Sequence, residues 1–106
     1  MMKEQIIQAI QSQKMIRVAF QKETTGEYVT RNVMPYDIFP KTKKDSWYEE
    51  DYLLGYTDIH LPHSPHPFTT YLSNIRNLEV LDESFDGRVI TQILKPRQAP
   101  IIQRNW

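Results

Sequence analysis

Three histidines stand close together in the middle of the chain and are the first side chains to consider for chemistry. His60, His63 and His66 are spaced by three residues and interleaved with prolines in "HLPHSPHP". This proline density favours polyproline II, in which successive imidazoles would share one edge but stand about 9 Å apart along the axis. Zinc needs all its ligands within about 2.1 Å of one ion. Two neighbouring histidines could share an ion, but three could not unless the segment folded back. We therefore interpret the segment as a solvated hairpin loop and predict no metal site.

A second group of oxygen-bearing side chains lies in "DESFDG". Asp82, Ser84, Asp86 and Gly87 occupy the first, third, fifth and sixth positions of a calcium-loop pattern. The twelfth position of that pattern requires a bidentate Glu but holds Ile93, and the preceding residues have the pattern of a strand, not of a helix. A turn that ends in a helix N-cap explains these residues better than a calcium site does.

Motifs of catalysis are absent from the sequence. The chain has no cysteine and only three glycines, and it contains no nucleophile elbow, phosphate-binding loop or metalloprotease motif. Glu49, Glu50 and Asp51 could supply acid–base pairs, but adjacent carboxylates on a predicted loop are expected to be exposed to solvent, which gives no sign of a catalytic pair. We predict a non-enzymatic protein without a cofactor.

Cations and aromatic rings on the predicted strands remain as candidates. Tyr52 and Tyr56 share a strand face, Tyr71 lies in the next strand, and Arg17 and Arg31 lie in two earlier strands. Aromatic faces beside guanidinium groups suit the stacking of bases or the binding of anionic small molecules. The alternative is that the tyrosines are ordinary sheet aromatics whose hydroxyls reach the surface. We predict a ligand-binding site made by these five residues.

Composition limits the class of protein. The chain has 106 residues, 40% of them hydrophobic, which suits one domain with a single core. Lys and Arg together number 13, as do Asp and Glu, so net charge gives no reason to expect long-range attraction to nucleic acid or an acidic membrane. The sequence has no apolar run of membrane-spanning length, and its start does not resemble a signal peptide. The lack of cysteine fits a reducing compartment, so we expect a cytoplasmic protein without a membrane partner.

Hydrophobic periodicity predicts one helix followed by five short antiparallel strands. Gly26 marks a hairpin turn, and Pro35 should bend or bulge the second strand because proline cannot donate a ladder hydrogen bond. Closing such a sheet into a small barrel would hide its edges. After the strands, Asp86 could cap a short helix that places Val89, Ile90, Ile93 and Leu94 on one face. The predicted elements are a helix over 3–13, strands over 15–22, 28–39, 52–57, 68–72 and 75–82, and a polar loop over 40–51.

The segment 87–106 carries four basic residues and no acid, and ends with Ile101, Ile102 and Trp106. Three interpretations stay open. The segment could pack on the domain or on a neighbouring subunit, it could be disordered, or it could be a basic arm that touches nucleic acid.

The order of these features resembles the WYL domain family. The resemblance covers residues 5–86 and rests on "IIQAIQSQKMIRVAF", on Gly26, Arg31, Val33, Pro35, Tyr36 and Ile38, and then on "DYLLGY" and "YLSNIRNLEVLDESF". It implies that residues 1–86 form a small Sm-like or SH3-like five-stranded barrel with a short N-terminal helix. A C-terminal helical or extended tail, residues 87–106, would follow this domain. The resemblance also implies a ligand-sensing domain of transcription regulators, which binds nucleic acid or a nucleotide-like molecule and acts on a regulatory partner.

The chain departs from the family pattern at several positions. Its Trp-Tyr-Leu reads Asp51-Tyr52-Leu53, and three family arginines are replaced by Phe68, Tyr71 and Asn74. Arg31 alone carries over, whereas Arg76 is one place too late and should point to the other strand face. The family's helix-turn-helix is also missing, so we expect a stand-alone, divergent member with a weakened phosphate site. The alternative function is a protein-interaction or homo-oligomerisation module that has lost its ligand and associates through the tail.

Overall fold

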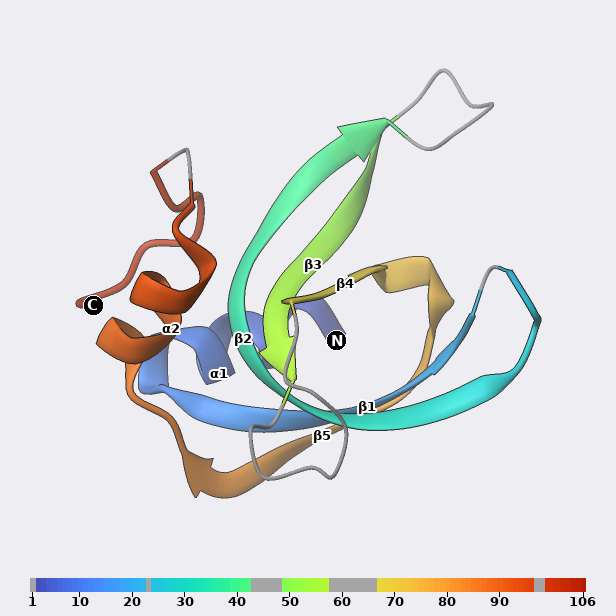
Figure 1. The fold of residues 1–106 in the computed structure, drawn as a ribbon, viewed down its shortest axis with the longest axis horizontal. Helices are drawn as coiled ribbons and strands as arrows, with labels where there is room; N and C mark the ends of the chain where they lie inside the picture. Colours follow the sequence, from blue (N-terminus) through green and yellow to red (C-terminus); the bar gives the residue numbers. More distant parts are fainter. Residues whose placement is uncertain (1, 23, 43–48, 58–66, 97–98) are drawn as a thin grey trace.

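Five antiparallel strands and two helices make up the fold (Figure 1). The computed structural model describes residues 2–22, 24–42, 49–57, 67–96 and 99–106. The strands are hydrogen-bonded in the order β4-β3-β2-β1-β5, which confirms the predicted mainly β fold. This order forms an open sheet with β4 and β5 at its edges. The elements are α1 (Met2–Ser12), β1 (Lys14–Gln21), β2 (Tyr28–Thr42), β3 (Glu49–Thr57), β4 (Pro67–Tyr71), the 3-10 turn η1 (Leu72–Asn74), β5 (Ile75–Ser84) and α2 (Gly87–Leu94).

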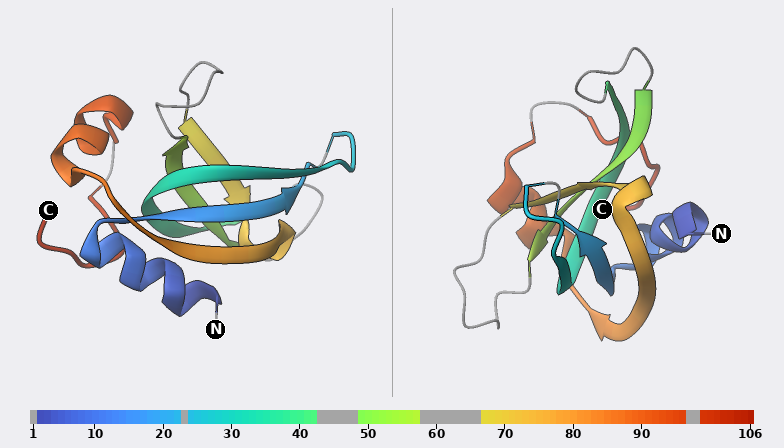
Figure 2. Two further views of the ribbon diagram at one scale, coloured as in Figure 1. Left: turned by 90° about the horizontal axis from the view of Figure 1, so that it is seen from below. Right: turned by 90° about the vertical axis from the view of Figure 1, so that its right-hand side faces the viewer.

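Helix α1 covers one side of the sheet and contacts β1, β2 and β5 (Figure 2). Its apolar residues recur at helical spacing, so that Ile6, Ala9 and Ile10 are all buried. The helix ends at Ser12, and the next residue, Gln13, has a φ of 56° in the left-handed region, which turns the chain into β1. Helix α1 closes one hydrophobic cluster, which we call the inner core. Its buried members are Ile6, Ala9, Ile10, Ile16, Val18, Val33, Ile38, Leu53, Phe68 and Ile75.

Strands β1 and β2 form the predicted hairpin. Gly26 has a φ of 74°, as the turn prediction required, and its N–H donates to the carbonyl of Lys22 (2.8 Å). The predicted bulge at Pro35 is also confirmed, because the register against β3 shifts between Pro35 and Asp37. Pro35 lies opposite Gly55, where a Cβ would stand 2.6 Å from the Met34 carbonyl oxygen. The two strands can therefore approach this closely only with glycine at position 55.

The predicted polar loop over 40–51 is too long. Strand β2 continues to Thr42 and β3 already begins at Glu49, so Lys41 pairs with Glu50 across the two strands. Opposite charges on directly paired positions favour the longer strands, a cross-strand effect that the charge pattern alone did not show. Residues 43–48 of the predicted loop lie outside the described residues.

Helix α2 covers the opposite side of the sheet from α1 (Figure 2). Asp86 caps the helix as predicted, since its carboxylate accepts the N–H of Arg88 (2.9 Å). The predicted apolar face is only partly correct, because Ile90 is buried and Leu94 half-buried, whereas Val89 and Ile93 are exposed. An eight-residue helix presents only a narrow stripe to the sheet. We name the cluster under α2 the outer core; its buried members are Met15, Met34, Tyr36, Phe85 and Ile90.

After α2 the chain forms an arm, residues 99–106, which passes β2 and ends beside α1 and the start of α2. Trp106 packs against both cores, and its Nε1–H donates to the carbonyl of Ile10 in α1 (2.8 Å). The arm thus packs on its own domain, in agreement with the first of the three interpretations of the C-terminal segment. Among the described residues, no helix has the length and apolarity needed to cross a membrane.

Candidate ligand-binding site

Three aromatic side chains form a row across β2, β3 and β4. The register places Phe39 opposite Tyr52 and Tyr52 opposite Tyr71. The ring centroids of Phe39 and Tyr52 are 5.3 Å apart, and those of Tyr52 and Tyr71 are 4.8 Å apart in an edge-to-face arrangement. Such pairs stabilise a sheet by about 0.5–1.5 kcal/mol beyond their area burial, and they hold the rings in one orientation. We name these three residues the aromatic row.

One end of the row opens into a cavity of about 250 Å³, the tyrosine pocket. The end of β1, the middle of β3, β4 and η1 all contribute to its walls. Its lining combines aromatic faces with short polar groups and one lysine, and consists of Phe20, Gln21, Lys22, Thr24, Tyr52, Thr69, Thr70, Tyr71 and Asn74. Aromatic walls with amide, hydroxyl and ammonium groups suit a flat, polar ligand that carries negative charge.

The cations around the tyrosine pocket are mostly lysines. Lys22 belongs to the lining, and Lys41 Nζ lies 4.5 Å from the ring centroid of Tyr52. Arg76 reaches the edge of the pocket, because its Nη2 donates to the Oε1 of the lining residue Gln21 (3.3 Å). Arg76 therefore contacts the pocket wall through Gln21, although it does not line the cavity itself.

The structure brings together two of the five predicted site residues. Tyr52 and Tyr71 are in contact and line the pocket, while Arg31 and Arg17 are outside its lining. Arg31 lies opposite Val18, and its Nη1 donates to the neighbouring carbonyl of Thr30 (2.9 Å). Sequence spacing could not show this separation, because it depends on the register between strands.

Arg17 and Tyr56 have structural contacts elsewhere. Arg17 pairs with Glu79 across β1 and β5 (3.0 Å) and donates to the Oδ1 of Asn32 (3.1 Å). Both members of the ion pair are about half exposed, and such pairs contribute little to stability. Tyr56 pairs with Met34 and packs against the outer core.

Sequence reasoning missed Phe39, Lys22 and Lys41. The contribution of Phe39 and Lys41 depends on which strand positions lie opposite one another, and the Pro35 bulge changes that register by one residue. Lys22 follows β1 directly, and only the fold brings it to the pocket. One signal was available: Phe39 and Lys41 alternate on one strand face, and the tyrosine-bearing strand follows directly.

A second polar cluster holds the arm in place. Asp37 is buried on β2, and its carboxylate accepts the backbone N–H groups of Ile101 and Ile102 (3.0 Å each) and Arg104 Nη2 (3.2 Å). The Arg104 guanidinium lies 4.7 Å from the Tyr36 ring centroid and 4.5 Å from that of Trp106. Burial lowers the pKa of Arg104, while the carboxylate of Asp37 opposes that shift; the guanidinium stays charged at neutral pH.

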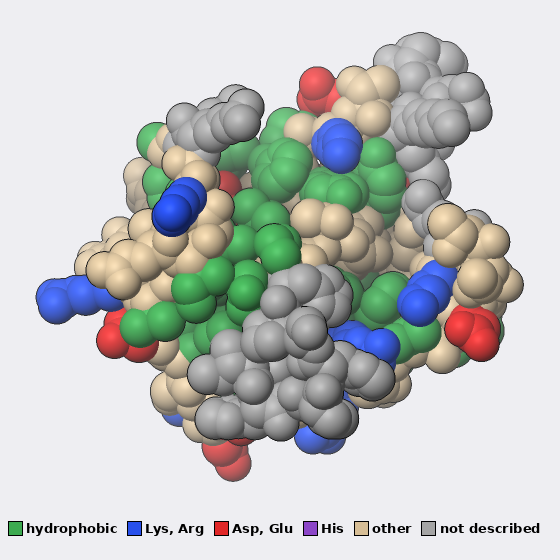
Figure 3. Space-filling view, in the orientation of Figure 1, with side chains coloured by type: hydrophobic (Ala, Val, Ile, Leu, Met, Phe, Trp, Pro, Cys, Tyr) green, Lys and Arg blue, Asp and Glu red, His purple; other side chains and the backbone are tan. Residues whose placement is uncertain are grey.

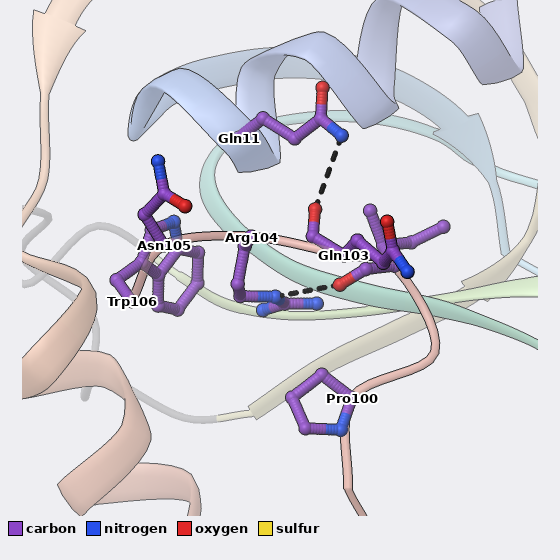
Figure 4. Close-up of a pocket in the computed structure, with 7 residues that line it drawn as sticks. Gln11, Pro100, Gln103, Arg104, Asn105 and Trp106 are labelled. Carbon is purple, nitrogen blue, oxygen red and sulfur yellow. Dashed lines mark hydrogen bonds between the residues drawn. The ribbon is translucent and has the colours of Figure 1, made fainter.

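A cavity of about 770 Å³ lies between the arm and Gln11 of α1 (Figure 4). Gln11 Nε2 donates to the carbonyl of Gln103 (3.1 Å), and Arg104 Nε donates to that of Ile102 (3.0 Å). Arg104 Nη1 is buried and has no hydrogen-bond partner within the described part of the chain. The contacts of this cluster are with the chain itself, so we assign it the role of fixing the arm.

The metal-site predictions concern two segments. The three histidines lie outside the described residues. Among the residues described, no three His, Cys, Asp or Glu side chains are grouped so that they could hold a metal ion. Asp86 of the calcium-like segment caps α2, and the N–H of Gly87 donates to the side chain of Gln13 (2.8 Å).

Comparison with known proteins adds no relative. No protein-family model matches the chain, and the searches of curated proteins and of solved structures gave no match.

Proposed function

We propose that the chain is a divergent WYL-like domain that binds a nucleotide-like or single-stranded nucleic-acid ligand in the tyrosine pocket. It acts without catalysis, as a sensing domain of a regulatory protein. The observation that carries this proposal is the contact between Tyr52 and Tyr71 at the wall of a polar pocket that contains Lys22. A base stacks on an aromatic face with little dependence on its identity, and a lysine at the rim attracts the phosphate.

The strand order supports the finer fold assignment. An N-terminal helix precedes β1, the sheet order is β4-β3-β2-β1-β5, and a single 3-10 turn joins the two edge strands. This strand order is expected of an Sm-like or SH3-like barrel. In such a barrel the edge strands β4 and β5 meet at the seam, where the sheet closes on itself. In such a barrel the tyrosine pocket lies at the end where η1 bridges that seam.

The test is a titration of the ¹⁵N-labelled chain with AMP and with a short single-stranded oligothymidylate, followed by backbone amide shifts. We expect saturable shifts at Gln21, Lys22, Thr69 and Asn74. Tyr52→Leu should raise the Kd by about 5-fold to 150-fold, since base–aromatic stacking contributes about 1–3 kcal/mol. Lys22→Gln should raise the Kd less and should reduce the salt dependence of binding.

Two variants serve as matched controls. Tyr28→Leu removes a tyrosine that is 67% exposed on β2 and lies outside the pocket lining, and Arg88→Gln removes an exposed positive charge on α2. Both should leave the Kd unchanged. Arg31→Ala shows whether the arginine predicted from the sequence also reaches the ligand. The proposal is wrong if neither ligand shifts the pocket amides, or if Tyr52→Leu and Tyr28→Leu have equal effects.

A further inference from the structure

A separate cavity of about 290 Å³ lies between the sheet and the C-terminal part of the chain. β2 and β3 provide one wall with Tyr36, Phe39 and Leu54, and the chain after α2 provides the other with Pro96, Ala99 and Ile101. Hydrophobic side chains gather on the face between the C-terminal segment and β2–β3 (Figure 3). All of these lining residues are apolar or aromatic, and the remaining one is Asp37.

The arm is fixed firmly enough to form a defined wall. Asp37 accepts the N–H groups of two successive arm residues, and the Arg104 side chain, 2% exposed, lies between two aromatic rings. The cavity volume is close to the lower end of the range of about 300–1,000 Å³ found for small-molecule sites. A largely apolar lining with one oriented polar group is also typical of such sites.

Asp37 determines which polar group a ligand would need. Its Oδ1 accepts two hydrogen bonds, from Ile102 N–H and Arg104 Nη2, whereas its Oδ2 accepts one, from Ile101 N–H, within the described residues. A carboxylate oxygen can accept two, so Oδ2 retains capacity for one further donor. Arg104 already balances the charge of this carboxylate and would repel a second cation. The complementary group is therefore a neutral donor.

We propose that this arm cavity binds a small, neutral, aromatic or apolar molecule with one hydrogen-bond donor, of the phenol or indole class. The ring would lie between Phe39 and Leu54 on one side and Ile101 on the other, and its O–H or N–H would donate to Asp37 Oδ2. Because the ligand would contact both walls, its binding would stabilise the packed arm. The site is distinct from the tyrosine pocket, although Phe39 belongs both to its lining and to the aromatic row.

The experiment titrates the ¹⁵N-labelled full chain with phenol, toluene and benzylamine as probes. Phenol should give saturable shifts of the Ile101 and Ile102 amides with a Kd in the millimolar to high-micromolar range. Toluene lacks the donor and should bind about threefold to tenfold more weakly. Benzylamine is cationic at neutral pH and should bind more weakly than phenol because of Arg104. Ala99→Leu and, independently, Leu54→Phe should fill the cavity and raise the Kd for phenol at least about tenfold.

Gln103→Leu is the matched control, because it adds a similar apolar side chain to the arm but lines the other cavity. It should leave phenol binding unchanged, as should Lys22→Gln in the tyrosine pocket. The proposal is overturned if phenol causes no saturable shift of the arm amides, if both filling variants bind phenol as well as the unmodified chain, or if toluene or benzylamine binds as tightly as phenol. Failure of AMP to bind would concern the tyrosine pocket alone.

Discussion

At the scale of single residues, Asp37 and Arg104 show how a charged pair becomes buried in a small domain. They are 67 positions apart in the chain, and their side chains are 9% and 2% exposed. A buried ion pair costs desolvation energy that its own attraction repays only with good geometry and additional hydrogen bonds. Here the two arm N–H groups and the faces of Tyr36 and Trp106 provide those additional contacts.

The two members of this pair should differ in their effect on stability. Asp37→Ala leaves two arm N–H groups and the Arg104 charge without their acceptor, so we expect it to lower the free energy of unfolding by about 3–5 kcal/mol. Arg104→Met removes the hydrogen bonds to Asp37 and to the Ile102 carbonyl. The Asp37 carboxylate keeps both arm N–H donors and methionine keeps much of the side-chain packing, so the effect should be clearly smaller. Urea unfolding followed by circular dichroism measures both. Equal losses would contradict the role assigned to Asp37.

At the scale of elements, the start of α2 and the end of the arm fit against each other. Gly87 is the first residue of α2, and a Cβ built there would overlap the Trp106 ring. The ring itself packs edge-to-face against Tyr36 and Phe85, with centroid distances of 5.8 and 5.6 Å. Position 87 therefore needs glycine because of close packing; its backbone lies in an ordinary helix.

Gly87→Ala tests that fit. In an exposed helix this substitution would stabilise by about 1 kcal/mol. Here we expect it to destabilise the chain by about 1–3 kcal/mol, because the ring must move. Trp106 fluorescence, recorded in a Trp47→Phe background, should shift to longer wavelength. Arg88→Ala, at the next and exposed helix position, should change neither Trp106 emission nor stability by more than about 0.5 kcal/mol.

Elements were easier to predict from the sequence than the contacts between them. The strand over 15–22, the Gly26 turn and the Asp86 cap were predicted from local signals, and the structure confirms each of them. The aromatic row depends on the register across a bulge, and the Asp37–Arg104 pair depends on the path of the arm. One hint existed: an acid within the apolar run "MPYDIF" needs a buried partner, and the acid-free basic segment after residue 86 contains four candidates.

At the scale of the whole molecule, the arm is part of the domain's own packing. Trp106 contributes to both cores, and the arm covers Asp37 on β2. The exposed apolar surface that remains includes Val89 and Ile93 on α2 and Ile101 on the arm, which are 45%, 40% and 52% exposed. The interaction-module alternative requires association through the tail, whereas the structure uses Trp106 and Ile102 of that tail internally.

Removal of the arm distinguishes packing within the domain from association through the tail, because the two predict opposite changes in self-association. If the arm serves the domain itself, the full chain should sediment as a monomer, and a chain ending at residue 98 should self-associate or unfold because its Met15, Tyr36 and Phe85 cluster is exposed. If the tail is an oligomer contact, the full chain should associate and the shortened chain should be monomeric. We expect the first result by sedimentation velocity across a range of protein concentrations. Trp106→Ala in the full chain should give a weaker effect in the same direction, since it removes the ring and keeps the Asp37 contacts with Ile101 and Ile102.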